Sequence, residues 1–373
     1  MRKRYFIVVI ILLSLNLRPA ITSLGPLLTL IKVDLGMTGV TASLLTTLPV
    51  FCMGLFSLLA VKLSQRLSVE VGLIIAMVIL SLSLLSRLLI DNSFWLILSA
   101  LLAGMGIGIA GPLIIGLIKQ DYPESHHLMS FYSVSMVGGA ALASSTAVPL
   151  FQGLGSWQLT LGLWGGLAFL PVFLLLPLAT KTQRKPQVNR QPQRNWLLML
   201  FFSLMAAIFY AITAWLAPFS QSLGFTSEES GLLLTLFTMI QLPISFLIPW
   251  LVSRQHNPLT WLGFCGLSEL IGLGILVGHT SPWLGTIFLG IGAGGLFPLA
   301  LMLPLTQSNH HHEAISLSAF MQSGGFMFGS LGPLLFGFVS DWLNFQAAFS
   351  ILILLVIWML ISIWGLYRSQ QKA

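Results

Sequence analysis

Apolar residues occur along the chain in runs of about 20 or more, and short polar or turn-rich breaks separate the runs. A helix needs about 20 mainly apolar residues to cross a lipid bilayer. The pattern therefore predicts an all-α membrane protein with twelve transmembrane helices. The predicted spans cover residues 5–31, 39–61, 70–90, 94–118, 128–150, 157–180, 196–220, 230–253, 258–279, 282–306, 314–338 and 345–367.

The composition supports lipid as the main solvent of the surface. The 373 residues are 56% hydrophobic and only 7% charged, with a mean hydropathy of +0.93, whereas soluble domains carry about 25% charged residues. The apolar run that begins at Tyr5 is longer than the core of a signal peptide and has no small-residue cleavage site after it. We therefore interpret this run as the first membrane span.

Lysine and arginine residues are distributed very unequally between the two predicted faces of the membrane. Of the 17, fourteen fall on the side of the N-terminus, Lys32 and Arg87 fall on the opposite side, and Arg18 lies inside a span. Positively charged loops mark the cytoplasmic side of membrane proteins. The bias predicts a multi-pass protein of a bacterial inner membrane with both termini in the cytoplasm.

The longest polar stretch, KTQRKPQVNRQPQRN at 181–195, falls near the middle of the chain. It is basic, contains proline and lacks apolar periodicity, as is typical of a linker. The predicted organisation is therefore a six-helix bundle over 1–180, a cytoplasmic linker over 181–195 and a second six-helix bundle over 196–373.

The two predicted halves resemble each other in sequence. GMGIGIAGPL at 104–113 matches GIGAGGLFPL at 290–299, and the same shift of 186 residues relates Gly138-Gly139 to Gly324-Gly325. Parallel six-helix repeats are typical of secondary transporters, in which two pseudo-symmetric bundles rock around a solute near the membrane midplane. The repeat indicates transport by alternating access.

Arg18 and Glu269 are the only charged residues that the span boundaries place deep in the membrane. Arg18 follows Tyr5 by 13 residues, so it lies ~20 Å along the helix. A central arginine costs about 2.5–3.5 kcal/mol on membrane-insertion scales. We expect it to face a cavity and to meet either a bound solute or Glu269 in an ion pair. Its planar set of donors favours small anions or strongly dipolar solutes.

Glu269 allows two interpretations. It is a candidate proton carrier, because burial makes a carboxyl group easier to protonate. Alternatively, it is a protonated residue that packs within the ninth span.

Several neutral side chains are candidates to complete a solute site around Arg18. An intramembrane amide also commonly bonds a neighbouring helix, and a tryptophan also anchors helices at the membrane interface. The predicted solute-binding residues beside Arg18 are Asn16, Thr22, Tyr132, Trp215, Gln241 and Gln322.

The sequence gives no support for nucleotide binding or for an enzyme. The stretch from Gly106 to Gly111 fits G-x-G-x-x-G, but a nucleotide fingerprint requires a preceding strand. Inside a membrane span, small residues indicate close helix packing. The sequence has no Walker, zincin or G-x-S-x-G motif. We therefore expect neither an enzyme nor a cofactor, metal or nucleic-acid partner.

One motif resembles a known family. NLRPAITSLGPLL at 16–28 is similar to the N-x-R-P-x-x-T-S-x-G-P-L-L pattern of the first helix in the cyanate and 2-nitroimidazole transporter branch of the major facilitator superfamily. GIGIAGPLIIGLIKQDYP at 106–123, GAGGLFPL at 292–299 and AFMQSGGF at 319–326 extend the resemblance. It implies secondary transport of a small anion such as cyanate, or of a nitro- or carboxylate-bearing compound.

Two alternatives remain. A proton-coupled exporter of drugs or toxic compounds is disfavoured, because SMVGGAALASS at 135–145 has the glycines of the antiporter pattern G-x-x-x-G-P without its proline. A membrane sensor or scaffold that does not transport is disfavoured by the lack of a signalling domain. The expected partners are a small solute, a possible coupling proton and the lipid bilayer, and we expect a monomer.

Overall fold

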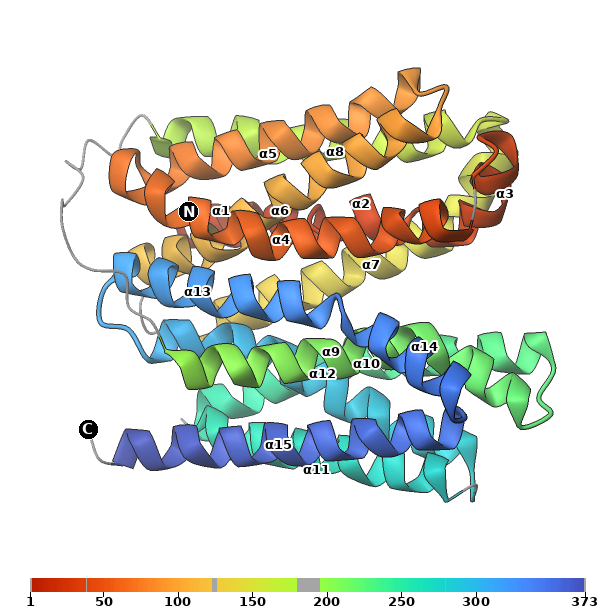
Figure 1. Cartoon of the computed structure of the whole chain (residues 1–373). Coiled ribbons are helices and arrows are strands. Elements are labelled where there is room, and N and C mark those ends of the chain that lie inside the picture. Colours follow the sequence, from red (N-terminus) through yellow and green to blue (C-terminus); the bar gives the residue numbers. More distant parts are fainter. Residues whose placement is uncertain are drawn as a thin grey trace. The chain divides into compact units, whose positions relative to one another are not determined.

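A computed structural model describes residues 2–37, 39–122, 126–179, 195–255, 257–278 and 280–371. Within these ranges every secondary-structure element is helical (Figure 1). They contain 12 helical stretches that are long and apolar enough to cross a membrane. These stretches overlap the predicted spans one by one. The prediction of an all-α membrane protein with twelve transmembrane helices is confirmed.

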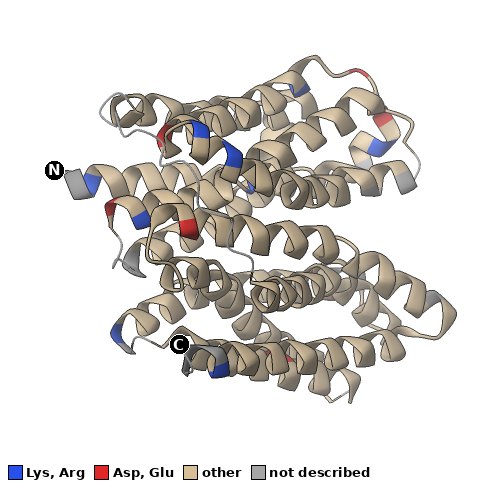
Figure 2. Cartoon of the chain, turned by 60° about the vertical axis from the view of Figure 1, so that its left-hand side comes forward, with Lys and Arg blue, Asp and Glu red and all other residues tan. Residues whose placement is uncertain are grey.

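Most of each helix carries no charged residue (Figure 2). The elements before the central stretch are α1 (Arg2–Leu15), α2 (Pro19–Thr22), η1 (Gly25–Leu27), α3 (Leu28–Asp34), α4 (Gly39–Arg66), α5 (Val69–Leu85), η2 (Ser86–Leu89), α6 (Ser93–Asp121), α7 (His126–Leu154) and α8 (Trp157–Ala179). The elements after it are α9 (Trp196–Ser222), α10 (Ser227–Gln255), α11 (Pro258–Val277), α12 (Pro282–Thr306), α13 (His311–Gly329), α14 (Gly332–Trp342) and α15 (Phe345–Gln371).

Asparagine residues fix where several spans begin. The side-chain oxygen of Asn92 accepts a hydrogen bond of 3.2 Å from the backbone N–H of Trp95 at the start of α6. Asn195 accepts one of 3.0 Å from Leu198 at the start of α9, and Asn257 caps α11 in the same way. Such caps satisfy N–H groups that have no partner within the helix. The polar breaks therefore set the starts of these spans by hydrogen bonding as well as by polarity.

Two predicted spans are interrupted rather than continuous. In the first, α1 ends at Leu15 and α2 begins at Pro19; in the eleventh, α14 begins at Gly332 with Pro333 in its first turn. A proline has no N–H with which to continue a helix. These are the spans predicted at 5–31 and 314–338, and each still forms one membrane-crossing stretch.

The chain packs as two compact units. They comprise residues 1–194 with 304–323, and residues 195–303 with 324–373. The predicted halves, 1–180 and 196–373, differ from these units at residues 304–323, which the prediction assigns to the second half and the packing assigns to the first unit. The predicted linker at 181–195 lies outside the described residues except for Asn195. The division into halves at the linker stays a prediction.

In the first unit, α6 packs against α4 and α5 through glycines. A Cβ atom at Gly108 would lie 2.5 Å from the carbonyl oxygen of Met53 in α4, and Gly104 meets the backbone of the same helix. A Cβ atom at Gly106 would lie 2.8 Å from the carbonyl oxygen of Ala76 in α5. Only a glycine allows backbones to approach this closely.

In the second unit, α12 uses the matched glycines in the same way. A Cβ atom at Gly294 would lie 2.9 Å from the Cα atom of Gln241 in α10, and Gly290 also meets α10. A Cβ atom at Gly292 would lie 2.8 Å from the carbonyl oxygen of Cys265 in α11. Each glycine therefore packs against the equivalent helix of its own unit, as the internal repeat predicts.

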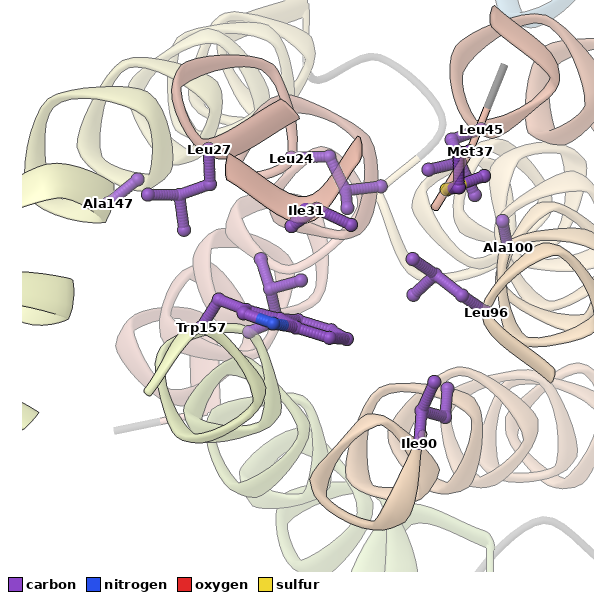
Figure 3. Packing of buried hydrophobic residues seen from close by; sticks show 11 residues of the cluster. Leu24, Leu27, Ile31, Met37, Leu45, Ile90, Leu96, Ala100, Ala147 and Trp157 are labelled. Atoms are coloured by element: carbon purple, nitrogen blue, oxygen red, sulfur yellow. The ribbon is translucent and has the colours of Figure 1, made fainter. Parts of the chain in front are cut away.

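An apolar cluster fixes the second part of the first span. Leu24, Leu27 and Ile31 project from the residues that follow the interruption, and Trp157 lies beside them (Figure 3). The indole N–H of Trp157 donates a hydrogen bond of 2.7 Å to the carboxylate of Asp34. The other members are Met37, Leu45, Ile90, Leu96, Ala100, Ala147 and Leu161. This packing holds the chain beyond the interruption in a defined position.

Candidate functional site

The interruption of the first span lies where the chain passes α7. Because Pro19 lacks an N–H, the carbonyl of Leu15 loses the donor that a continuous helix would supply. Gly139 of α7 lies directly against this carbonyl, and a Cβ atom there would collide with it. The proline therefore interrupts the first span at the point where Gly139 allows α7 to approach its backbone.

Arg18 stands at this interruption, immediately before the first residue of α2. Its carbonyl oxygen accepts hydrogen bonds from the N–H groups of Ile21 at 3.0 Å and Thr22 at 3.1 Å. The hydroxyl of Thr22 donates a third to the same oxygen, also at 3.1 Å. The first turn of α2 thus fixes the backbone of Arg18, and its side chain is half-buried.

Tyr132 of α7 lies within electrostatic range of Arg18. Its side chain is only 2% exposed, and α7 packs against both α1 and α2. The packing of α7 therefore places Tyr132 on a helix next to the segment of Arg18, although the two residues are 114 positions apart in the sequence. A phenol can donate to an anion that the guanidinium attracts.

Asn16 lies in the same turn and is 2% exposed. Its amide nitrogen donates a hydrogen bond of 2.7 Å to the carbonyl of Leu12. Its amide oxygen is buried and receives no hydrogen bond from the described residues. A buried acceptor of this kind is costly unless a partner reaches it. Asn16 thus has an unused acceptor two residues before Arg18 in the sequence.

The two predicted glutamines have partners within their own helices. Gln322 donates a hydrogen bond of 2.7 Å to the hydroxyl of Ser318. Gln241 donates one of 3.1 Å to the carbonyl of Phe237. Both side chains are buried. These bonds occupy one amide donor each, and glutamine has a second donor and an acceptor.

Trp215 has a packing role within the second unit. Its indole N–H donates a hydrogen bond of 2.9 Å to the carbonyl of Pro333. Its ring stacks on Phe336 with centroids 5.5 Å apart, and a Cβ atom at Gly337 would lie 2.7 Å from it. The tryptophan therefore braces α14 directly after the interruption in the eleventh span.

Glu269 is buried in α11 with 1% of its surface exposed. One carboxyl oxygen receives no hydrogen bond from the described residues. Gly292 of α12 packs directly against its side chain. A charge at such a position costs several kcal/mol unless it is paired. We therefore expect Glu269 to be a neutral carboxylic acid that packs between α11 and α12.

Glu269→Gln is expected to leave both the melting temperature and the uptake driven by a pH gradient unchanged, because glutamine has the shape of the neutral acid. The exposed Glu229 of α10 provides the matched control, Glu229→Gln. Loss of pH-driven accumulation in Glu269→Gln alone would contradict this expectation and would identify Glu269 as a proton carrier.

Two charged side chains that were not predicted to belong to a site are also buried. Arg87 is 0% exposed and Glu70 is 2% exposed. Glu70 accepts a hydrogen bond of 3.0 Å from the side chain of Gln120. Arg87 and Glu70 lie near the two ends of the third span, inside its predicted boundaries of 70–90.

A signal for Arg87 is present in the sequence. It interrupts the run SLSLLSRLLI at 81–90, and all the remaining residues of this run are leucine, isoleucine or serine. An arginine in a loop would more commonly have polar neighbours on both sides. Glu70 has a weaker signal, because an acidic residue in the first turn of a helix needs no further explanation.

The polar residues at the interruption of the first span form the candidate site. The segment at the interruption carries the guanidinium of Arg18, the hydroxyl of Thr22 and the amide oxygen of Asn16, and it packs against α7, which carries the phenol of Tyr132. This set has a positive charge, neutral donors and acceptors, and no general base. It suits recognition of an anion or a strong dipole better than covalent chemistry.

Comparisons with known proteins identify relatives over most of the chain. The uncharacterized transporter YycB of Bacillus subtilis is 35% identical over 344 residues, which cover 89% of this chain and 85% of that protein. The cyanate transport protein CynX of Escherichia coli is 32% identical, with 88% of each chain covered. The 2-nitroimidazole transporter of Escherichia coli is 27% identical, with 97% of this chain and 95% of that one covered.

Solved structures share the fold. The human organic anion transporter MFSD10 superposes with a TM-score of 0.78 at 16% identity, covering 97% of this chain and 100% of that one. The proton:xylose symporter XylE superposes with a TM-score of 0.77 at 13% identity, covering 97% and 95%. The family model of the Major Facilitator Superfamily matches residues 6–330. The chain therefore belongs to the major facilitator superfamily of membrane transporters.

Proposed function

We propose that this protein is a secondary transporter for a small anionic or strongly polar solute, with Arg18 as the residue that holds the solute. The observation that carries the proposal is the position of Arg18 at the interruption of the first span, with Tyr132 in its electrostatic range. A guanidinium and a phenol together recognise an anion through charge and directed hydrogen bonds.

The interruption makes Arg18 suitable for this role. A half-buried guanidinium on a turn between two short helices can reach a solute, whereas one on a lipid-facing helix would have to bend towards the headgroups. Interrupted helices are also where related transporter architectures place polar groups for a solute. The repeated glycines support alternating access, because each half has the same close-packed helices around its fourth span.

The relatives narrow the chemical class. Cyanate is a small linear anion, and 2-nitroimidazole carries a strongly dipolar nitro group; these are the compounds in the names of two relatives. Both offer the planar or terminal acceptor atoms that a guanidinium binds. We therefore propose cyanate-like anions and nitro or carboxylate compounds as the solutes to test first.

A thermal-unfolding screen of the purified protein tests this proposal. Potassium cyanate, nitrate, formate and benzoate would be compared with chloride at equal ionic strength. A ligand that binds only the folded state at 100 times its Kd adds about 2.7 kcal/mol to the free energy of unfolding. We expect at least one of these anions to raise the melting temperature of the wild-type protein above the chloride control.

The same screen on Arg18→Gln should show no stabilisation. Arg4→Gln is the matched control, because Arg4 is an exposed arginine in the neighbouring helix α1. Stabilisation that persists in Arg18→Gln would move the solute site elsewhere. Absence of stabilisation by any of these anions in the wild type would reject the proposed solute class.

The alternatives give different results. Export of apolar drugs predicts that Arg18→Ala leaves efflux largely intact. A sensor or scaffold predicts no solute-dependent uptake by reconstituted vesicles. We also propose that the protein is a monomer in a bacterial inner membrane. The lysine and arginine distribution supports a cytoplasmic location of both termini.

A further inference from the structure

A fully buried arginine lies at the end of the third span, outside the residues proposed to hold the solute. Arg87 belongs to η2, and its side chain is 0% exposed. Its Nη2 atom donates a hydrogen bond of 3.1 Å to the carbonyl of Ala20 in α2. Its Nε atom donates one of 3.2 Å to the hydroxyl of Ser99 in α6. One guanidinium therefore connects η2, α2 and α6.

The hydrogen-bonded chain continues beyond the guanidinium. The hydroxyl of Ser99 donates a hydrogen bond of 2.7 Å to the carbonyl of Leu96 in its own helix. This bond orients the hydroxyl oxygen so that it accepts from Arg87. Since α6 is packed against α4 and α5 through its glycines, Arg87 ties α2 to a firmly held helix.

The carbonyl that Arg87 contacts belongs to the segment that carries Arg18. Helix α2 has only four residues, Pro19–Thr22, and the last carbonyls of a helix have no N–H partner within it. Ala20 follows Arg18 by two residues, and the first turn of α2 holds the Arg18 carbonyl. A shift of Ala20 would therefore displace the backbone of Arg18.

Stability alone gives little reason for an arginine at position 87. Both groups that accept its hydrogen bonds are neutral, and its Nη1 atom makes no hydrogen bond to the described residues. Burying a charge in such surroundings commonly makes a fold less stable than an apolar residue of similar volume would. An arginine supplies what an apolar side chain lacks, namely directed donors to α2 and α6.

We propose that Arg87 is a positioning residue that holds α2 in place and thereby sets the location of the Arg18 guanidinium. The proposal rests on the proposed function, because the site that it serves is the anion site at Arg18. Arg87 acts through the backbone of α2 and does not contact the solute.

Hydrogen–deuterium exchange of the ligand-free protein in detergent gives the first test. The amides of Ile21, Thr22 and Ser23 are bonded to carbonyls of the first turn of α2, so their exchange reports its opening. We expect exchange in Arg87→Leu to be about 5-fold faster, which matches the loss of one ordinary hydrogen bond. Arg87→Lys should be intermediate, because one ammonium cannot span both acceptors.

Ser81→Ala is the matched control. Ser81 lies in α5, is buried and donates a hydrogen bond of 2.7 Å to the carbonyl of Gly165 in α8. Its replacement removes a buried interhelical bond of the same unit without touching α2. We expect exchange at residues 21–23 in Ser81→Ala to equal that of the wild type.

Stabilisation by potassium cyanate gives the second test. In Arg87→Leu the half-saturating concentration should rise about 5-fold while the maximal stabilisation is kept, and Arg87→Lys should restore part of the affinity.

Wild-type exchange in the Arg87 variants would overturn the proposal, as would faster exchange with unchanged cyanate affinity. If Arg87→Leu fails to fold, Arg87→Lys and Ser99→Ala decide by the same criteria. If cyanate does not bind the wild type, the proposed function fails, and exchange alone decides whether Arg87 holds α2.

Discussion

Arg18→Gln is expected to reduce uptake of the transported anion by reconstituted vesicles to the level of empty vesicles at low concentration. Loss of a hydrogen bond to a charged group costs about 1.5–3 kcal/mol, which corresponds to ~10- to 150-fold in affinity. Because the guanidinium is the only charge in the group formed with Asn16, Thr22 and Tyr132, no other member of this group replaces its attraction for an anion.

Arg18→Lys separates charge from geometry. A lysine keeps the positive charge but has no planar pair of donors, so we expect weakened but measurable uptake. Arg4→Gln should behave as the wild type in the same vesicles. Equal uptake by the wild type and by Arg18→Gln would contradict the assignment of Arg18 as the residue that holds the solute.

Gly108→Ala is expected to destabilise the protein strongly. The added Cβ atom would lie 2.5 Å from a backbone oxygen of α4, and a backbone cannot move aside as a flexible side chain can. Overpacking of this kind costs about 1–3 kcal/mol. Since the repeat gives α12 the same packing, Gly294→Ala should lower the melting temperature in a similar way.

Two glycines in open surroundings provide the controls. A Cβ atom at Gly166 in α8 or Gly274 in α11 would meet nothing within 4 Å, and alanine favours a helix over glycine by about 1 kcal/mol. Gly166→Ala and Gly274→Ala should therefore melt at or above the wild-type temperature. If Gly108→Ala and Gly294→Ala melted like these controls, the close packing of α6 and α12 would be refuted.

The helix positions were predictable because few backbone structures are stable inside a lipid bilayer. A stretch such as 94–118 has enough apolar residues to span the membrane, and the backbone must satisfy its hydrogen bonds internally. Pro19 itself predicts a bend in the first helix, because it leaves the carbonyl one turn earlier without a donor. Membrane helices often accommodate proline, and it is the contact between Gly139 and the Leu15 carbonyl that shows where the first helix opens.

The candidate site was predicted only in part. Arg18 stands out in the sequence, because a charge deep in an apolar run needs a reason. The roles of Trp215 and Arg87 depend on residues more than 60 positions away, such as Pro333 and Ala20, and a single sequence does not reveal those neighbours. The hydrogen bond of Trp215 to Pro333 and that of Arg87 to Ala20 are therefore visible only in the structure.

Anomalous diffraction from crystals soaked in potassium selenocyanate tests the central claim most directly, because selenium marks the position of a cyanate-like anion. We predict a selenium peak beside the guanidinium of Arg18, close to Tyr132. A selenium peak at another place, with the Arg18 side chain directed away from the anion or paired with a carboxylate of the protein, would contradict it.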